Sequence, residues 1–354
     1  MTISTIFSLM ASIIFLNIGL VFNGGFFAPD NFNPAKTGLV LGVSEYQPAD
    51  KTMALEGNNF NQAVDSLIEG IKSFHPLSLS QLLQFNMPMQ KLPENTVKEV
   101  VAKAISFDLA AENGAILDCQ SDNLFFSKSP DRIWPIASIT KLFTAYTFLD
   151  YNPGWETIYK IKASDKREGG KIYLFTGDKV KVKDLFYFSL VGSDNTATAA
   201  LVSSTGLTEE EFIIKVNSKI RELGFKNTSI VDAAGLRDGN ISTAREIAQF
   251  ANIALAVEEI NRASLTKKYE FTTEQGRKKV IASTNELLNV FPEQEVNLLG
   301  GKTGHINSSG YCLVSKFKGA DGRAIVTVVL GADSEINRFG LTRKLVDLYY
   351  NYKP

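Results

Sequence analysis

The sequence predicts an α/β fold of the α+β type, in which an antiparallel sheet is flanked by helices and carries an inserted all-helical subdomain. Strand-like stretches lie near both ends of the domain, whereas the chain between them, from about residue 139 to residue 280, is mainly helical in pattern. Hydrophobic residues make up 44% and charged residues 21% of the 354 positions. These are globular values, so the chain can bury a sizeable core.

The expected strands are short runs of apolar residues bounded by turn residues. They cover residues 104–109, 124–128, 311–317 and 324–330. Gly114 falls in the connection between the first two, and Gly319 begins the turn between the last two.

Apolar residues at helical spacing predict the helices. They cover the segment after Pro135, the run through Leu185 and Leu190, and residues 196–202, 209–223, 242–263 and 336–352. Ser242 is the expected N-cap of the helix that it begins.

Three regions follow one another along the chain. Residues 1–27 contain the apolar run 3–22, which is about long enough to cross a bilayer. The first positive side chain is Lys36 and no small-x-small cleavage site is present, so an uncleaved membrane anchor is favoured over a cleaved signal peptide. Residues 28–95 read as a linker with one amphipathic helix, and residues 96–354 as the catalytic domain.

Composition argues against several classes of protein. The net charge is −1 and no long basic run occurs, so nothing favours nucleic-acid binding. Cys119 and Cys312 are too few for a metal cluster, and free buried thiols are favoured over a disulfide. The two histidines, His75 and His305, support neither a Ser-His-Asp triad nor a metal site.

A serine and a lysine stand near the start of the helix after Pro135. Ser138 and Lys141 are three positions apart and therefore share one face. The helix is apolar nearly all round, which is typical of a buried helix, and a buried hydroxyl beside a desolvated amine is a nucleophile beside a base. The spacing alone is weak evidence, because Ser264 with Lys267 repeats it.

Two further motifs follow in the chain. They are Ser193-Asp194-Asn195 and Lys302-Thr303-Gly304. Copies of both occur at residues 121–123 and 36–38, but these precede Ser138 in the chain, whereas the two motifs follow it.

In this order the motifs resemble those of the penicillin-recognising serine enzymes. The chain is similar to the D-alanyl-D-alanine carboxypeptidases, the low-molecular-mass penicillin-binding proteins of the serine β-lactamase-like superfamily. The similarity runs from about residue 104 to the C-terminus. The segments that carry it are residues 135–142, Gly235-Leu236 with Ser242-Thr243-Ala244, 284–288, 301–305 and 310–313. It implies a β-lactamase or penicillin-binding-protein fold.

The resemblance also implies roles for these residues. Ser138 would attack the carbonyl between two D-alanines, and Lys141 would accept its proton. A base near pH 7 needs the lysine pKa lowered by ~3 units, about 4 kcal/mol, which burial and nearby Lys302 favour. Ser193 would relay protons, and Asn195 would bind the substrate backbone.

The remaining implied roles concern substrate binding. Lys302 and Thr303 would receive the terminal carboxylate, and Gly304 would let substrate backbone lie against the strand. The amides of Ser138 and His305 would form the oxyanion hole.

The implied partners are peptidoglycan stem peptides as substrates, β-lactam antibiotics as covalent inhibitors, and the membrane through the N-terminal helix. No cofactor or metal is implied. Many relatives anchor through a C-terminal tail; here the chain stops at Pro354 after the last predicted helix, so attachment is expected from residues 3–22, with the catalytic domain extracytoplasmic.

Three alternatives stay open. An endopeptidase acting on cross-links would use the same residues. A serine β-lactamase would need a Glu-x-x-Leu-Asn element, and Glu286 to Asn289 is one residue short of it. A catalytically silent penicillin-binding domain is disfavoured because all the reactive residues are present.

Overall fold

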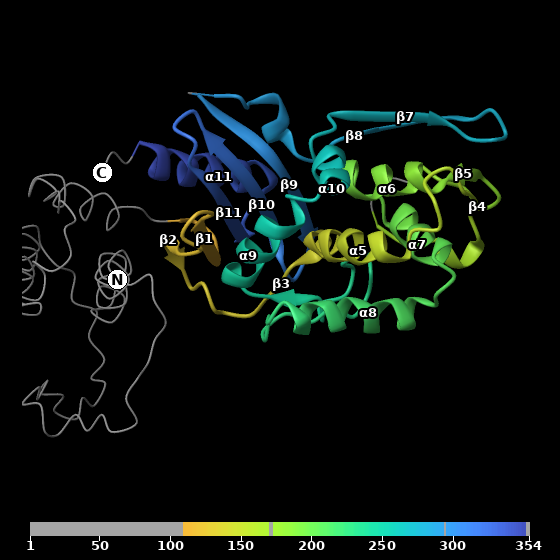
Figure 1. Ribbon diagram of the computed structural model, residues 1–354, viewed down its shortest axis with the longest axis horizontal. Helices are drawn as coiled ribbons and strands as arrows, with labels where there is room; N and C mark the ends of the chain where they lie inside the picture. The colour runs from red at the N-terminus through yellow and green to blue at the C-terminus, as the bar shows by residue number, and fades with distance from the viewer. Residues whose placement is uncertain (1–108, 170–172, 294, 352–354) are drawn as a thin grey trace, which may run out of the picture. The chain divides into compact units, whose positions relative to one another are not determined.

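The computed structural model describes residues 109–169, 173–293 and 295–351. Its main sheet has five antiparallel strands in the order β2-β1-β11-β10-β9 (Figure 1). The strands are β1 Asn113–Asp118, β2 Leu124–Lys128, β9 Val296–Ile306, β10 Gly310–Gly319 and β11 Ala324–Ala332. Within this sheet β9 is an edge strand, so one side of it pairs with no other strand of the sheet.

Each face of the sheet has its own apolar core, because successive residues of a strand point to opposite faces. On β11, Val326 and Val328 belong to the core shared with the inserted helices. Ile325 and Val329 of the same strand belong to the core beneath the last helix, α11 (Glu335–Tyr350). The sheet is therefore covered on both faces, which confirms the predicted architecture.

Six α-helices of the described chain lie between the second and ninth strands, and most of them extend beside the sheet (Figure 1). They are α5 Thr140–Phe148, α6 Val182–Val191, α7 Asn195–Ser204, α8 Glu209–Glu222, α9 Ala244–Ala254 and α10 Glu258–Ser264. Helix α9 contacts the sheet itself and contributes to the core opposite α11. In the described part of the chain, no helix has both the length and the apolar character of a membrane span.

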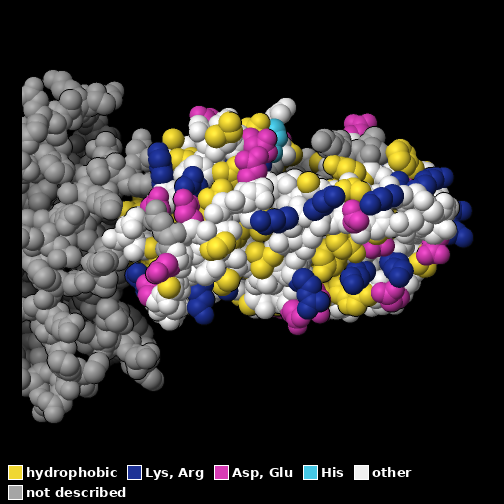
Figure 2. Space-filling model, turned by 90° about the horizontal axis from the view of Figure 1, so that it is seen from above, with side chains coloured by type: hydrophobic (Ala, Val, Ile, Leu, Met, Phe, Trp, Pro, Cys, Tyr) yellow, Lys and Arg dark blue, Asp and Glu magenta, His cyan; other side chains and the backbone are white. Residues whose placement is uncertain are grey.

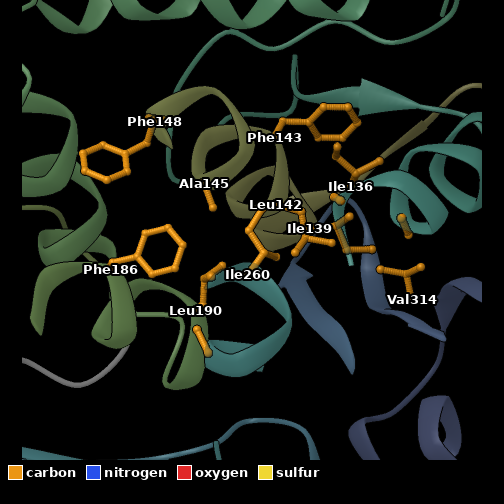
Figure 3. Close-up of a cluster of buried hydrophobic side chains, with 14 of the residues drawn as sticks. Ile136, Ile139, Leu142, Phe143, Ala145, Phe148, Phe186, Leu190, Ile260 and Val314 are labelled. Atoms are coloured by element: carbon orange, nitrogen blue, oxygen red, sulfur yellow. The ribbon is translucent and has the colours of Figure 1, made fainter. Parts of the chain in front are cut away.

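Helix α5 is buried on nearly every side, as its composition predicts. Among its residues only Tyr146 is partly exposed. Figure 3 shows Leu142, Phe143 and Phe148 of this helix among buried side chains from the helices and from the sheet. The Phe143 ring stacks on Phe250 of α9 with centroids 3.7 Å apart. The segment that carries the reactive residues is thus fixed from several directions.

The predicted connection between the first two strands contains a strand. Gly114, which the prediction places in that connection, lies inside β1. A side chain at this position would collide with Leu109, because a Cβ would lie 2.1 Å from its Cδ2 atom. A close approach of this kind is a common reason for glycine within a strand. Residues 104–108 lie outside the described part.

The helix predicted over residues 242–263 is two helices, α9 and α10, separated at residues 255–257. Its N-cap is Thr243, whose side chain accepts a hydrogen bond from the N–H of Glu246. Ser242 instead pairs with Trp134 in the small sheet of β3 (Trp134–Pro135) and β6 (Ile241–Ser242). Adjacent Ser and Thr offer the same capping chemistry, so the strand pairing decides between them.

Two short hairpins were not predicted. They are β4 Ile158–Lys160 with β5 Lys179–Lys181, and β7 Lys268–Thr272 with β8 Lys278–Ala282. The strands at 124–128, 311–317 and 324–330 and the final helix are confirmed to within a few residues. The predicted membrane segment, linker and amphipathic helix lie outside the described residues.

Candidate active site

Ser138 lies in a single 3-10 turn, Ala137–Ile139, that leads directly into α5. The residue before it, Ala137, has a φ of +46°, a left-handed conformation that non-glycine residues rarely adopt. Such strain persists only where the surroundings fix it, and it often accompanies function. The serine is half-buried, so its hydroxyl remains accessible.

Lys141 is fully buried, and its amine has three hydrogen-bond partners. The Nζ atom lies 2.9 Å from Ser138 Oγ, 2.8 Å from Asn195 Oδ1 and 2.6 Å from the carbonyl oxygen of Ala234. The partners come from the 3-10 turn before its own helix, from α7 and from the loop before β6. The first two motifs therefore meet at one nitrogen atom.

Burial lowers the pKa of Lys141 from an ordinary value of 10.5 to about 7, while the charges of Asp232 and Asp194 oppose this shift. A desolvated amine favours its neutral form, because an uncharged group loses less hydration energy in an apolar environment. At neutral pH a substantial fraction of Lys141 is thus unprotonated and can accept a proton from Ser138.

The second lysine of the site is also buried. Lys302 Nζ donates to Ser193 Oγ at 2.9 Å and to the carbonyl oxygen of Thr303 at 2.9 Å. Burial lowers the pKa of Lys302 well below its ordinary value, and the charges of Lys141 and Arg338 lower it further. The sequence predicted that Lys302 would help to lower the pKa of Lys141. In the structure the repulsion between the two amines lowers the pKa of Lys302 instead, while the pKa of Lys141 is lowered by burial and raised by two carboxylates.

The Ser193-Asp194-Asn195 motif lies at the start of α7. Ser193 has a φ of +57°, which turns the chain sharply before the helix. Asp194 is the N-cap, and its side chain accepts from the N–H of Ala197 at 2.6 Å. Asn195 accepts from Lys141 and donates through Nδ2 to the carbonyl of Gly169 at 3.2 Å. Each residue of the motif has its own contact. Ser193 contacts Lys302, Asp194 caps α7, and Asn195 contacts Lys141.

Gly304 allows edge strand β9 to approach the nucleophile. A Cβ at this position would lie 2.9 Å from the carbonyl oxygen of Ile136 and 3.2 Å from the amide nitrogen of Ser138. Thr303 is buried, and its Oγ1 atom lies 2.6 Å from Thr284 Oγ1. The His305 ring stacks on Tyr311 with centroids 4.1 Å apart. The strand and the serine amide are thus in direct contact.

Three groups at this site were given no role from the sequence, although the first two lie in or beside segments that carry the family resemblance. Thr284 contacts Thr303, and the Asp232 turn supplies the Ala234 carbonyl to Lys141. Arg338 of α11 is 3% exposed and donates to the carbonyl of Gly304 at 3.3 Å. A long cationic side chain on an amphipathic helix is ordinarily a surface residue, so no signal in the sequence marks Arg338.

The competing copies of the motifs that fall within the described residues do not assemble a site. Ser264 Oγ donates to the carbonyl of Asn261, which is a local helix contact. Ser121 Oγ donates to Asp118 within a turn, and the copy at residues 36–38 lies outside the described part. The free cysteines agree with the prediction, with Cys312 buried and Cys119 partly buried. Within the described ranges no cluster of His, Cys, Asp and Glu could hold a metal ion.

The fold is shared with solved penicillin-binding enzymes. A Streptomyces DD-transpeptidase is similar with a TM-score of 0.62 and 24% identity, covering 68% of this chain and 97% of that one. A penicillin-binding protein of Listeria monocytogenes in its cefotaxime-bound form is similar with a TM-score of 0.60 and 25% identity, covering 69% and 98%. The fold and the site thus define the class as serine-type hydrolases with the penicillin-binding fold.

The family model described as D-alanyl-D-alanine carboxypeptidase matches residues 97–334, and the chain belongs to this family. The D-alanyl-D-alanine carboxypeptidase DacF of Bacillus subtilis is 28% identical over 77% of this chain and 70% of its own length. The D-alanyl-D-alanine endopeptidase of Haemophilus influenzae is 33% identical over 59% of this chain and 70% of its own length.

The lowered pKa of Lys141 has a consequence for stability. With a pKa near 7 when folded and 10.5 when unfolded, the unfolded chain binds more protons between these values. The free energy of unfolding should therefore rise with pH across this window, by at most about 1.4 kcal/mol per pH unit. Urea unfolding between about pH 7 and pH 10 should show a smaller rise in Lys141→Met than in the unmodified protein. Lys302, whose pKa burial also lowers, contributes to the rise in both proteins.

Lys318→Met is the matched control, because Lys318 is exposed on the neighbouring strand β10. Its unfolding should follow the same pH dependence as the unmodified protein. Parallel curves for all three proteins would contradict the lowered pKa.

Proposed function

We propose that this protein removes the terminal D-alanine from peptidoglycan pentapeptides through an acyl-enzyme on Ser138. The observation that carries the proposal is the buried amine of Lys141, 2.9 Å from the Ser138 hydroxyl, with a pKa of about 7. Family membership supports the choice of substrate. Both the carboxypeptidases and the endopeptidases among the relatives are named for D-alanyl-D-alanine.

In the proposed reaction Ser138 Oγ attacks the carbonyl between the two D-alanines as Lys141 takes its proton. The amide nitrogens of Ser138 and His305 would receive the developing oxyanion, a contribution of about 2.7–4 kcal/mol per donor. The carbon–nitrogen bond then breaks, and the leaving amine takes up a proton. Ser193, which contacts Lys302, is the proposed relay for that proton. Water finally hydrolyses the ester on Ser138.

The cations around strand β9 explain the preference for a free carboxylate. Lys302 and Arg338 are both buried beside Thr303 and Gly304. A buried amine and a buried guanidinium beside one strand form a favourable place for an anion, because a bound carboxylate would favour the charged form of Lys302. Glu335, the acidic partner of Arg338 at 2.7 Å, is 60% exposed.

The rest of the stem peptide has room beside the strand. A hollow of about 570 Å³ begins at His305 and is lined by Trp134, Tyr311 and the β9–β10 turn. On the face of the molecule in Figure 2, Lys and Arg side chains are interspersed with Asp and Glu, so no single sign of charge dominates it.

Mass analysis of the products tests the proposal. A pentapeptide ending in D-Ala-D-Ala should lose one D-alanine with the unmodified protein and remain intact with Ser138→Ala. An endopeptidase would instead leave the pentapeptide intact and cleave a cross-linked dimer of stem peptides. Cleavage of the dimer alone would favour that second function.

The same assay addresses the carboxylate. Lys302→Ala should lower kcat/KM for the pentapeptide acid, whereas the C-terminal amide should already be poor with the unmodified protein and should lose little more. Lys318→Ala, an exposed lysine on the adjacent strand, should leave both substrates unaffected. Equal losses on acid and amide would mean that Lys302 acts only on structure or on the pKa of Lys141.

A β-lactam should bind covalently and persist. Penicillin resembles acyl-D-Ala-D-Ala, so Ser138 would open its ring, and the retained bulky group would hinder the incoming water. Glu286, in the segment nearest in sequence to a β-lactamase deacylation element, is exposed and lies in the 3-10 turn Glu286–Asn289. The two carboxylates that act on Lys141 are already engaged, Asp232 by a backbone turn and Asp194 by a helix cap.

Intact mass should therefore detect a penicillin adduct that lasts minutes or longer and is absent in Ser138→Ala. Rapid repeated hydrolysis without an adduct would favour a β-lactamase. A folded protein with neither adduct nor turnover would favour a silent binding domain.

We further propose that residues 3–22 anchor the protein in the cell membrane by a single span, with the catalytic domain extracytoplasmic. The support is the apolar run in the sequence and the absence of a small-x-small cleavage site after it. The protein should resist extraction from membranes by salt and should retain Met1. A mature N-terminus near Pro29 would contradict the anchor.

A further inference from the structure

Asp232 is a buried carboxylate with an unusually complete set of hydrogen-bond donors. It is 7% exposed. Its two oxygens accept from the backbone N–H groups of residues 234–237, at 2.7 to 3.1 Å, and from the side-chain amide of Asn240. Several N–H donors on one carboxylate stabilise its charged form and fix the backbone that carries them.

The turn held by Asp232 touches the reactive segment at two points. The carbonyl oxygen of Ala234 accepts from Lys141 Nζ at 2.6 Å. Gly235, with a φ of +78°, lies directly against the peptide before the nucleophile. A Cβ on Gly235 would be 2.0 Å from the carbonyl oxygen of Ala137 and 3.0 Å from the amide nitrogen of Ser138. One turn therefore contacts both the general base and the backbone of the nucleophile.

We propose that Asp232 is a positioning residue for acylation, which holds the turn of residues 232–237 against Lys141 and Ser138 and supplies a negative charge facing Lys141. This inference rests on the proposed function of Ser138 and Lys141. It adds a residue that lies outside the three motifs and would not touch the substrate.

Three ionisable groups lie near the amine of Lys141. Asp232 and Asp194 raise its pKa against the effect of burial, and the third is the buried amine of Lys302 on β9, whose own pKa Lys141 lowers. The two carboxylates are not equivalent. Burial raises the pKa of Asp194 itself, and its Oδ2 atom has no hydrogen-bond partner. Asp232, by contrast, has hydrogen-bond donors on both oxygens.

Asp232→Asn tests the inference because it removes the charge at nearly constant size. Loss of the negative charge and of a well-placed Ala234 carbonyl both favour neutral Lys141. The acid limb of the rate of acylation by penicillin, measured from about pH 5 to about pH 9, should therefore move to lower pH by about 1 unit. The maximal rate should fall at least about tenfold, because the reacting groups lose their alignment.

Asp232→Glu keeps the charge and should return the acid limb to its original pH, even if its maximal rate stays low. Asn240→Ala removes one donor to Asp232 and keeps the charge, so it should lower the rate without moving the limb. These variants keep the inference testable if Asp232→Asn does not fold.

Glu246 provides a matched control. It is also 7% exposed and holds a turn, accepting from the N–H groups of Lys226 and Asn227 at 3.0 Å and from Thr228 Oγ1 at 2.6 Å. It does not act on the pKa of Lys141. Glu246→Gln should lower Tm but leave the acid limb where it is.

Direct titration of the Lys141 amine by NMR, with ¹³C-labelled lysine, gives a second readout that needs no substrate. The pKa of Lys141 should be lower in Asp232→Asn than in the unmodified protein and unchanged in Glu246→Gln. Identical acid limbs and identical Lys141 titrations in folded Asp232→Asn and unmodified protein would overturn the inference. An unmodified protein that penicillin does not acylate would instead overturn the proposed function, and the NMR titration would still decide the role of Asp232.

Discussion

The site depends on the burial of one amine. Lys141 has no exposure to solvent, and its three hydrogen-bond partners are a hydroxyl, an amide oxygen and a backbone carbonyl, none of them a charged acceptor. Burial without a direct carboxylate partner is what lowers its pKa to about 7. A salt bridge in place of the Asn195 contact would favour the ammonium form and remove the base. The three neutral acceptors therefore leave Lys141 able to act as a base.

Holding an amine in this state requires a rigid surround, and the fold supplies it from both sides. The apolar residues of α5 are buried among helices and sheet, so the helix cannot turn its lysine toward water. Edge strand β9 closes on the nucleophile at Gly304, and the turn of residues 232–237 closes on it at Gly235. At both positions a side chain would meet the backbone around Ser138, so glycine is required for the approach.

The order of the motifs along the chain distinguished those at the site from their copies. Hydrophobic periodicity predicted the helices and the later strands. Each motif residue singled out from the sequence lies at the site described above. Local chemistry failed where two residues offer equal propensity. Ser242 and Thr243 are both good N-caps, and only the pairing of Ser242 with Trp134 leaves the cap to Thr243. Gly114 is predicted in a connection rather than a strand, because the contact that requires glycine there, with Leu109, is not visible in a local pattern.

The sequence by itself determined the class of fold and the residues of the three motifs, because hydrophobic period and chain order are properties of the chain alone. Only the tertiary structure decided how these residues are charged and held. The pKa of Lys141 depends on its burial and on Asp232, which is 91 positions further along the chain. Arg338 reaches Gly304 only because α11 packs on the sheet. Burial and charge interactions depend on separation in space, and separation along the chain does not predict them.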